Sequence, residues 1–173
     1  MARPMVIIND FSTSVRKALY EIDKEWESYE GLIVCGTHSP TDVEKIIEMI
    51  REVREAGTPF LGICFGHQLA SIEYAKNVLG IQRATSEEFY HKDSDELIVK
   101  KLPKLKVGLY PTNRMRLDSP RESYWNNYEV IDGFEELWKK ADNFITCQYH
   151  PEYQSSKDNP HRLLVKFIES CKK

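Results

Sequence analysis

The stretch that decides the fold is Pro59-Phe60-Leu61-Gly62-Ile63-Cys64-Phe65-Gly66-His67-Gln68, a short apolar run that ends in a cysteine between two glycines. This pattern is typical of a nucleophile elbow, in which a strand turns abruptly into a helix and exposes the residue at the turn. Gly62 and Gly66 leave room for the two backbones to approach each other. Because the N-terminus of a helix favours a thiolate over a thiol, the sequence predicts that Cys64 is a catalytic nucleophile.

The sequence around this elbow predicts alternating strands and helices. Short apolar runs indicate buried strands, and apolar residues at helical spacing indicate amphipathic helices. Thr41 followed by Glu44 matches a capping box, which marks where a helix begins. The elements expected in the first half are strands over residues 5–8 and 31–36, the elbow strand up to residue 63, and helices over residues 12–25, 41–57 and 65–77. Such an alternation predicts a parallel α/β sheet.

The second half of the chain changes character. Short apolar segments separated by polar loops predict strands over residues 97–99, 106–110 and 128–130. Residues 143–149 are expected to return as a core strand. A terminal amphipathic helix is expected from about Pro160, with His161 at its start.

Length and composition limit the kind of protein. The 173 residues suffice for one ordinary domain with its own core, so we expect a single domain over residues 1–173. No apolar run approaches the roughly 20 residues of a membrane helix, and no export signal is visible, which predicts a cytoplasmic protein without a membrane partner. The net charge of -3 leaves no general basic surface, which argues against a nucleic-acid partner.

The cysteines and histidines indicate neither a disulfide framework nor a metal site. Four cysteines without a CxxC pair, in a chain without an export signal, are expected to be reduced. His38 and His67 lack the spacing of metal ligands. We therefore expect no metal and no cofactor.

A second group of polar residues follows the late strand, in Gln148-Tyr149-His150-Pro151-Glu152. A thiol nucleophile needs an imidazole that takes and returns a proton and a carboxylate that orients the imidazole. With Pro151 stiffening the turn, Glu152 can accept a hydrogen bond from the ring nitrogen of His150 that faces away from sulfur. Cys64, His150 and Glu152 are therefore the predicted catalytic residues.

These two motifs together resemble the class I glutamine amidotransferases, in which a Cys-His-Glu triad hydrolyses glutamine to glutamate and ammonia. From about residue 31 to the end, the chain is similar to the glutaminase domains of CTP synthases. The segments that carry this similarity are Ile72–Gly80, Thr85–Phe89, Arg114–Leu117, Tyr128–Val130 and His150–Ser156. The resemblance implies a three-layer α/β/α flavodoxin-like fold with a mostly parallel central sheet. Residues 8–31 leave room for one helix but hardly for the family's extra strand, so we expect a sheet trimmed at its N-terminal edge.

The resemblance assigns a chemical role to the triad. The thiol of Cys64 would form a γ-glutamyl thioester, with His150 as general acid and base and Glu152 as the group that orients it. The oxyanion hole would be formed by backbone N–H groups, those of Phe65 and of Gly36 or Thr37.

The resemblance also implies substrate contacts, and two positions depart from the family. Gln68 and Glu88 match positions near bound glutamine, with Glu88 suited to the α-ammonium group. Thr37 stands where the family's loop has glycine. An oxyanion donor can need a positive φ, which threonine adopts far less readily than glycine. Asn127 stands where CTP synthases have an arginine that helps to hold the α-carboxylate, so a charged contact becomes at best a neutral one.

The sequence therefore predicts a glutaminase-like hydrolase that cleaves the side-chain amide of glutamine or a related γ-glutamyl compound through a cysteine thioester. Two alternatives stay open: a catalytically weak binding or regulatory homologue, and a γ-glutamyl peptide hydrolase. No segment reads as a P-loop, so any synthetase that uses the ammonia would be a separate partner subunit.

Overall fold

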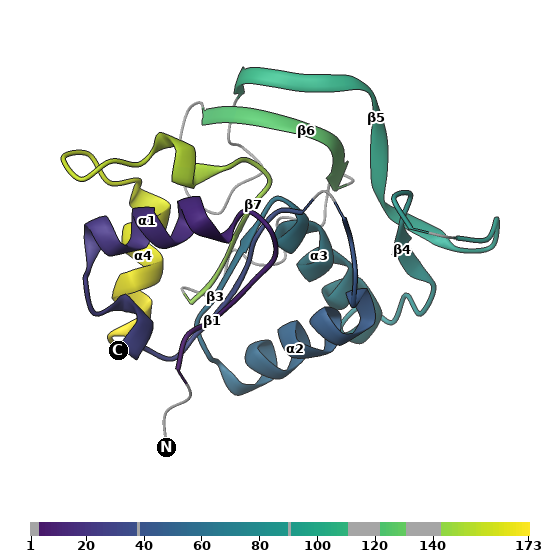
Figure 1. Cartoon of the computed structure of the whole chain (residues 1–173). Helices are drawn as coiled ribbons and strands as arrows, with labels where there is room; N and C mark the ends of the chain where they lie inside the picture. Colours follow the sequence, from purple (N-terminus) through teal and green to yellow (C-terminus); the bar gives the residue numbers. More distant parts are fainter. Residues whose placement is uncertain (1–3, 38, 90, 111–121, 131–142) are drawn as a thin grey trace.

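Four parallel strands form the central sheet of this computed structural model (Figure 1). In spatial order they are β1 (Val6–Ile8), β2 (Leu32–Val34), β3 (Phe60–Ile63) and β7 (Phe144–Cys147). The structure describes residues 4–37, 39–89, 91–110, 122–130 and 143–173, and only the backbone within 101–110 and 122–130. Because the strands are parallel, their carboxyl ends meet at one edge of the sheet, where Ile63 pairs with Cys147.

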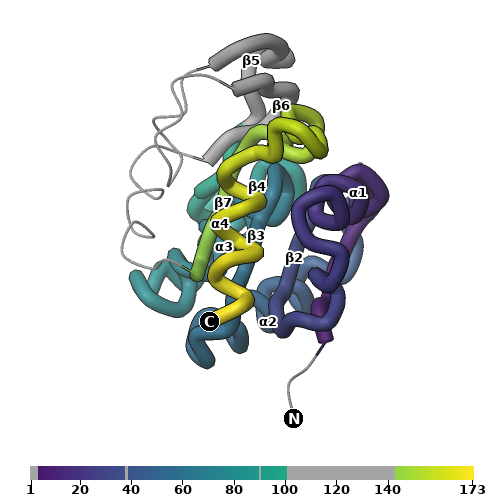
Figure 2. The backbone as a smooth tube through the Cα atoms, turned by 90° about the vertical axis from the view of Figure 1, so that its left-hand side faces the viewer, coloured from purple at the N-terminus to yellow at the C-terminus, as the bar shows by residue number. Residues whose placement is uncertain are grey.

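Helices cover both faces of this sheet (Figures 1 and 2). One face carries α1 (Ser12–Ile22) and α4 (Arg162–Cys171), and the other carries α2 (Val43–Ala56) and α3 (Phe65–Asn77). Successive residues of a strand point to opposite faces. Within β2, Ile33 therefore packs in the core under α1 and α4, while Leu32 and Val34 pack in the core under α2 and α3. This three-layer arrangement confirms the predicted fold class.

The segment between β1 and β2 contains no strand. Residues 9–31 form α1 and a 3-10 helix, η1 (Trp26–Ser28), so β1 lies at the edge of the four-stranded sheet. The helix predicted over residues 12–25 ends three residues early, at Ile22. The reason is that the chain becomes extended at Asp23 and then turns through η1, which buries Trp26 in the core.

The capping box predicted at Thr41 and Glu44 is wrong. Asp42 precedes α2 in the left-handed conformation, with φ of 53°, and no side-chain hydrogen bond caps the helix. The helix therefore begins at Val43, and Glu44 is its second residue rather than the third residue that a capping box requires. The predicted C-terminus is confirmed, because Gly57 adopts φ of 72° directly after α2.

A smaller sheet flanks α3. It contains β4 (Ala84–Ser86), which runs parallel to β5 (Glu96–Tyr110), and β6 (Glu122–Val130), which is antiparallel to β5. The strands predicted over residues 97–99 and 106–110 are parts of β5, whose pairing with β6 shifts register between Lys101 and Lys106. The segment 114–117, which contributed to the family resemblance, lies outside the described residues.

The C-terminal part of the chain matches the prediction closely. β7 is shorter than the predicted strand over residues 143–149, and the 3-10 helix η3 (Pro151–Gln154) follows it. His161 caps α4, because its Nδ1 accepts a hydrogen bond from the N–H of Leu163 at 3.1 Å, which confirms its place at a helix start. Within the described part of the chain, no helix is both long and apolar enough to cross a membrane.

Candidate active site

Cys64 occupies a strained turn between β3 and α3. It is the residue directly before the helix and adopts φ of 56° and ψ of -102°, a conformation that a side chain with Cβ rarely takes. Its N–H donates to the carbonyl of Cys147 at 2.8 Å, and its carbonyl accepts from the N–H of Gln68 at 3.1 Å. The chain therefore has the strand-to-helix elbow that the sequence predicts at this position.

Two glycines make this elbow sterically feasible. A Cβ atom at Gly66 would lie 2.1 Å from the carbonyl oxygen of Val34, which no side chain can accommodate. A Cβ atom at Gly62 would lie 2.9 Å from the backbone carbonyl of Gly66. The start of α3 therefore sits directly on β2 and β3, and only glycine permits that approach.

His150 and Glu152 lie at the end of the neighbouring strand. His150 comes three residues after β7 and directly before η3, and Glu152 lies in the first turn of η3. The Nδ1 atom of His150 and the Oε1 atom of Glu152 are 2.8 Å apart. The side chain of His150 is 11% exposed and that of Glu152 is fully buried, so this pair is largely shielded from water.

His150 also forms a hydrogen bond with Cys64. Burial alone would lower the pKa of His150, but hydrogen bonds with Cys64 and Glu152, together with the charges of these two groups, raise it to about 10. At neutral pH the ring is therefore a cation between a sulfur and a carboxylate. A protonated ring beside the sulfur can deliver its proton to a leaving group and, once neutral, take one back.

Gln148 is a further residue of this site that the sequence analysis did not assign. Its Nε2 atom donates to the Sγ atom of Cys64 at 3.6 Å, and its Oε1 atom accepts from Nε2 of Gln68 at 3.4 Å. Its place in the same short motif as His150, immediately after β7, is the signal that could have suggested it. Gln68 was predicted to contact substrate; in the structure it is 2% exposed and its amide contacts Gln148.

The loop after β2 lies against this site. A Cβ atom at Gly36 would lie 3.1 Å from Cε1 of His150 and 2.9 Å from Cδ2 of Phe11, so the backbone of Gly36 is in close contact with both rings. The hydroxyl of Thr37 donates to Oδ2 of Asp10 at 2.8 Å and accepts from the N–H of Ser39 at 3.0 Å. The side chain of Thr37 thus ties this loop to the loop between β1 and α1.

Glu88 and Asn127 are the other two residues predicted to contact the substrate. Glu88 follows β4, its N–H donates to the hydroxyl of Ser86 at 3.1 Å, and burial raises the pKa of its carboxyl. Phe89 packs edge-on against Phe65, the residue after Cys64, with ring centroids 6.0 Å apart, which brings this segment next to the elbow. Asn127 lies on β6, where the backbone alone is described, so its predicted contact lies outside the described side chains.

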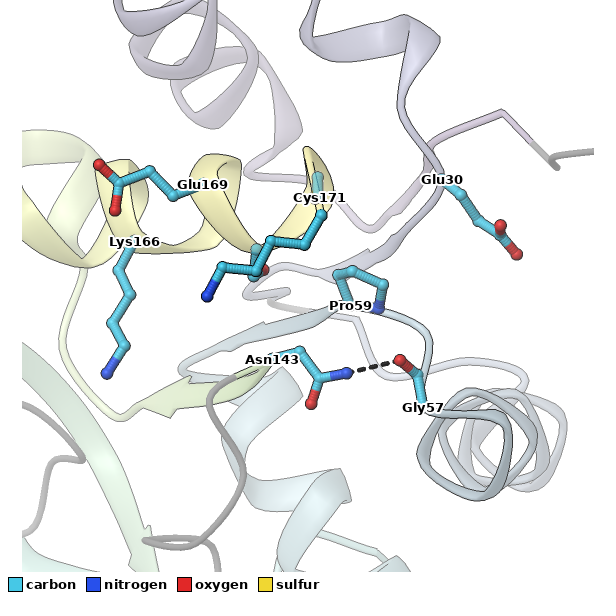
Figure 3. A pocket seen from close by; sticks show the side chains of 9 residues that line it. Glu30, Gly57, Pro59, Asn143, Lys166, Glu169 and Cys171 are labelled. Atoms are coloured by element: carbon cyan, nitrogen blue, oxygen red, sulfur yellow. Dashed lines mark hydrogen bonds between the residues drawn. The ribbon is translucent and has the colours of Figure 1, made fainter.

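A pocket at the other end of the sheet is separate from these residues (Figure 3). Pro59 and Asn143, which line it, precede β3 and β7, whereas Cys64 and His150 follow these strands. The remaining lining residues are Glu30, Gly57 and five residues from the last turns of the chain: Lys166, Glu169, Ser170, Cys171 and Lys173. The pocket therefore does not belong to the candidate active site.

No group of three or more metal-ligating side chains is found in the described ranges. His67 is buried in α3, and its Nδ1 lies 3.0 Å from the hydroxyl of Thr146 on β7, a contact between helix and sheet. His38 lies outside the described residues.

A parallel sheet with a strained cysteine at one strand end and a His–Glu pair at the next defines an α/β protein built around a cysteine elbow. Comparison with known families places it more narrowly. The model of the glutamine amidotransferase class-I family matches residues 6–170, and the chain belongs to this family.

The relatives agree with the resemblance seen in the sequence. The chain is 32% identical to the CTP synthase of Lactobacillus johnsonii over an alignment of 180 positions that covers 80% of the chain and 33% of that relative. It is 30% identical to the CTP synthase of Moorella thermoacetica over an alignment of 186 positions that covers 84% of the chain and 34% of the relative. The chain thus spans about a third of the length of these relatives.

A solved structure supports the fold. The glutaminase domain of Trypanosoma brucei CTPS with bound acivicin matches with a TM-score of 0.77 and 18% identity, over 99% of this chain and 94% of that one. The predicted resemblance to class I glutamine amidotransferases, and to the glutaminase domains of CTP synthases, is confirmed.

Proposed function

We propose that this chain hydrolyses the side-chain amide of glutamine, or of a related γ-glutamyl compound, through a thioester on Cys64. The observation that carries the proposal is the position of His150, which is hydrogen-bonded both to Cys64 and, at 2.8 Å, to Glu152. The membership of the chain in the class-I glutamine amidotransferase family adds the substrate class.

The reaction would proceed in two steps. The thiolate of Cys64 attacks the amide carbon, the carbon–nitrogen bond breaks, and His150 gives its proton to the leaving nitrogen, which departs as ammonia. A water molecule then attacks the thioester while His150 takes its proton, and glutamate leaves as the thiolate is restored. Glu152 orients the ring of His150 in both steps and stabilises its charged form.

Backbone N–H groups would stabilise the tetrahedral intermediate. Phe65 is the first residue of α3, where N–H groups have no partner within the helix. The second donor would come from Gly36 or Thr37, in the loop that touches His150. Such donors typically contribute about 3 kcal/mol each to transition-state stabilisation. Glutamine itself would be held by the predicted contacts Glu88 and Asn127, whereas Gln68, also predicted as a contact, is buried with its amide on Gln148.

Glutamate release by the wild type and by Cys64→Ala tests this mechanism. We expect the wild type to release glutamate and ammonia in equal amounts and Cys64→Ala to release neither. Acivicin, which is bound in the trypanosomal neighbour, is a probe to test for labelling of the thiol. Cys171→Ala is the matched control, because Cys171 lies at the end of α4 and should not affect turnover or labelling. Hydrolysis that survives in Cys64→Ala would eliminate the mechanism.

A γ-glutamyl peptide hydrolase would use the same residues on a larger substrate. The departures at Thr37 and Asn127 affect the contacts to free glutamine and therefore keep this alternative open. Comparison of kcat/KM for free glutamine with that for γ-glutamyl dipeptides decides between the two substrates.

A weak binding or regulatory homologue is the second candidate. It is favoured by the hydrogen bond from Thr37 to Asp10, which ties down the loop that would supply the oxyanion donor. Calorimetric titration with glutamine separates this candidate from the hydrolase. Binding without turnover would support the regulatory role, and binding with turnover would reject it.

We also propose that ammonia from this site is passed to a synthetase subunit. The support is that the matched relatives are CTP synthases of which this chain spans about a third. A pull-down from the native source, probed for an ATP-dependent synthetase, tests this partner. A cytoplasmic location and a single domain, both predicted from the sequence, are likewise proposed here.

A further inference from the structure

Gln148 lies beside the Cys64 sulfur, and the roles proposed above do not include it. Its Nε2 atom is 3.6 Å from Sγ of Cys64, within the range of a hydrogen bond to sulfur. Gln148 is 7% exposed. A buried amide that left its N–H groups unpaired would destabilise the fold, so a contact to sulfur at this position has an energetic value of its own.

Gln68 determines which end of the Gln148 amide faces the sulfur. The Nε2 atom of Gln68 donates to Oε1 of Gln148 at 3.4 Å, and Gln68 is itself 2% exposed on α3. With the nitrogen of Gln68 on this side, the oxygen of Gln148 faces Gln68, because an amide nitrogen donates and does not accept. The N–H groups of Gln148 are thereby directed to Cys64.

We propose that Gln148 stabilises the thiolate of Cys64 by donating a hydrogen bond to it, and that Gln68 is a positioning residue that holds Gln148 in the donating orientation. The inference takes from the proposed function only that Cys64 reacts as a thiolate. A neutral donor is suited to this task, because hydrogen bonds to a charged acceptor are strong and an amide does not titrate. His150 can then remain the group that carries the proton.

In the described ranges, titratable groups that act on Cys64 lie in the segment after β7. His150 hydrogen-bonds with the thiol, and Glu152 hydrogen-bonds with His150. The ring of Tyr153 lies 5.4 Å from that of His150, and burial, then the charge of Glu152 and, to a smaller extent, that of Cys64 raise the pKa of Tyr153. At the end of β2, burial and then the charge of Glu152 raise the pKa of the Cys35 thiol, which keeps Cys35 neutral. Gln148 adds a donor to this set without adding a charge.

Alkylation of Cys64 by iodoacetamide, measured between about pH 5 and pH 10, tests the proposal without any need for glutamine turnover. Gln148→Met removes the donors at similar volume, and Gln148→Glu replaces them with a carboxylate. We expect Gln148→Met to shift the pH midpoint of alkylation upward by about one unit and to slow alkylation near pH 6 about tenfold. Gln148→Glu should shift it further, and Gln68→Leu should shift it less. Peptide mapping, with Cys64→Ser as the unlabelled reference, assigns the signal to Cys64.

The high-pH limit of the same curve separates an electrostatic role from a structural one. Where the thiol is ionised, the alkylation rate of the variants should exceed that of the wild type by no more than about threefold if Gln148 acts on ionisation, because a less stabilised thiolate is slightly more nucleophilic. A change in that limit without a shift of the midpoint would mean that Gln148 only shapes access, and would overturn the proposal. An unshifted midpoint in Gln148→Glu, in protein with a wild-type melting temperature, would overturn it as well. A shifted midpoint in a protein that does not hydrolyse glutamine would leave this inference standing and reject the proposed function instead.

Discussion

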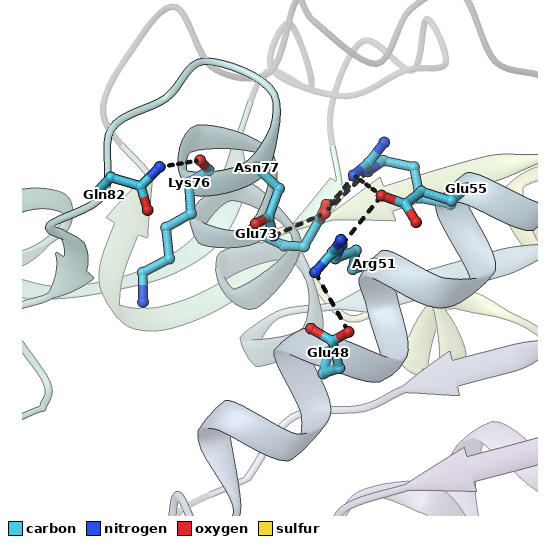
Figure 4. Close-up of polar contacts among 8 residues, drawn as sticks. Glu48, Arg51, Glu55, Glu73, Lys76, Asn77 and Gln82 are labelled. Carbon is cyan, nitrogen blue, oxygen red and sulfur yellow. Dashed lines mark hydrogen bonds and ion pairs between the residues drawn. The ribbon is translucent and has the colours of Figure 1, made fainter.

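Among the described side chains, those of Glu73 and Glu152 are both fully buried beside a cationic partner, yet their contacts differ. Glu73 on α3 is held by Arg54 of α2, whose Nε lies 3.0 and 2.9 Å from the two carboxylate oxygens and whose Nη2 lies 2.7 Å from Oε1. Asn77 donates to the same carboxylate at 3.3 Å (Figure 4). Glu152 has one hydrogen bond, 2.8 Å to His150, and its Oε2 has no partner within the described ranges.

The two pairs differ in whether the cation can exchange a proton, as the proposed mechanism requires of His150. The guanidinium of Arg54 never loses its charge, and the hydrogen bond with Glu73 raises its pKa further. That pair can fasten α2 to α3 but cannot move a proton. The imidazole of His150 can gain and lose a proton, and a single carboxylate contact orients it without occupying the nitrogen that faces sulfur. Burial and opposite charge are therefore common to both pairs, and the chemistry of the cation distinguishes them.

Removal of each carboxylate charge should produce the largest contrast. Glu152→Gln is expected to lower kcat for glutamine hydrolysis about a thousandfold or more, because a neutral amide does not stabilise the imidazolium and can impose the wrong ring tautomer. Glu73→Gln should leave kcat per folded molecule almost unchanged and lower the melting temperature instead. Steady-state kinetics and thermal unfolding of both variants make the comparison. Similar kcat losses in the two variants would contradict the distinction.

The pKa of His150 gives a second measure of the difference between the two pairs. Hydrogen bonds with Cys64 and Glu152 raise the pKa of His150 to about 10 against the burial that would lower it, so its NMR signals should report an imidazolium through neutral pH. Cys64→Ser and Glu152→Gln should each lower this pKa. Because the folded-state pKa lies above the unfolded value of about 6.5, the contribution of His150 to stability is fully present below pH 6.5 and is lost as the pH rises through about 10. A ring that is neutral at pH 7 would contradict this account.

Loss of the arginine should cost more stability in the buried pair than in an exposed pair on the same helix. Arg54→Met leaves the buried carboxylate of Glu73 without its main partner and is expected to lower the free energy of unfolding by about 3 kcal/mol. Arg51 pairs with Glu48 and Glu55 on the surface of α2, so Arg51→Met is the matched control with an expected loss of about 0.5 kcal/mol or less (Figure 4). Urea unfolding measures both. Equal losses would mean that the contact with Glu73 does not fasten the two helices.

The sequence revealed what is encoded locally at the strand ends. The elbow around Cys64 could be predicted because the glycines that permit it are its sequence neighbours, and the His150–Glu152 contact could be predicted because it spans two residues. The contact of Gln148 with Cys64 spans 84 residues and depends on β3 lying beside β7, which no local pattern specifies.

One wrong prediction and one contact that was not predicted have a related origin. The capping box failed because the left-handed backbone at Asp42 moved the start of α2, and composition does not determine that conformation. The Arg54–Glu73 pair was not predicted because either residue alone resembles the exposed charges around it. Whether a charge on a helix is buried depends on the element that packs against it, here α3 against α2.

The smallest expected effect concerns the third donor to Glu73. Asn77→Ala removes a hydrogen bond of 3.3 Å from a carboxylate whose two oxygens Arg54 already holds, so we expect a stability loss of about 0.5 kcal/mol. In the background of Arg54→Met the same change should cost more, because Asn77 is then a main remaining donor to a buried charge. A double-mutant cycle in urea measures this difference, which for residues of one network is typically about 0.5–3 kcal/mol. Strict additivity would show that Glu73 does not depend on its full set of partners, and the contrast with the single contact of Glu152 would then rest on the cation alone.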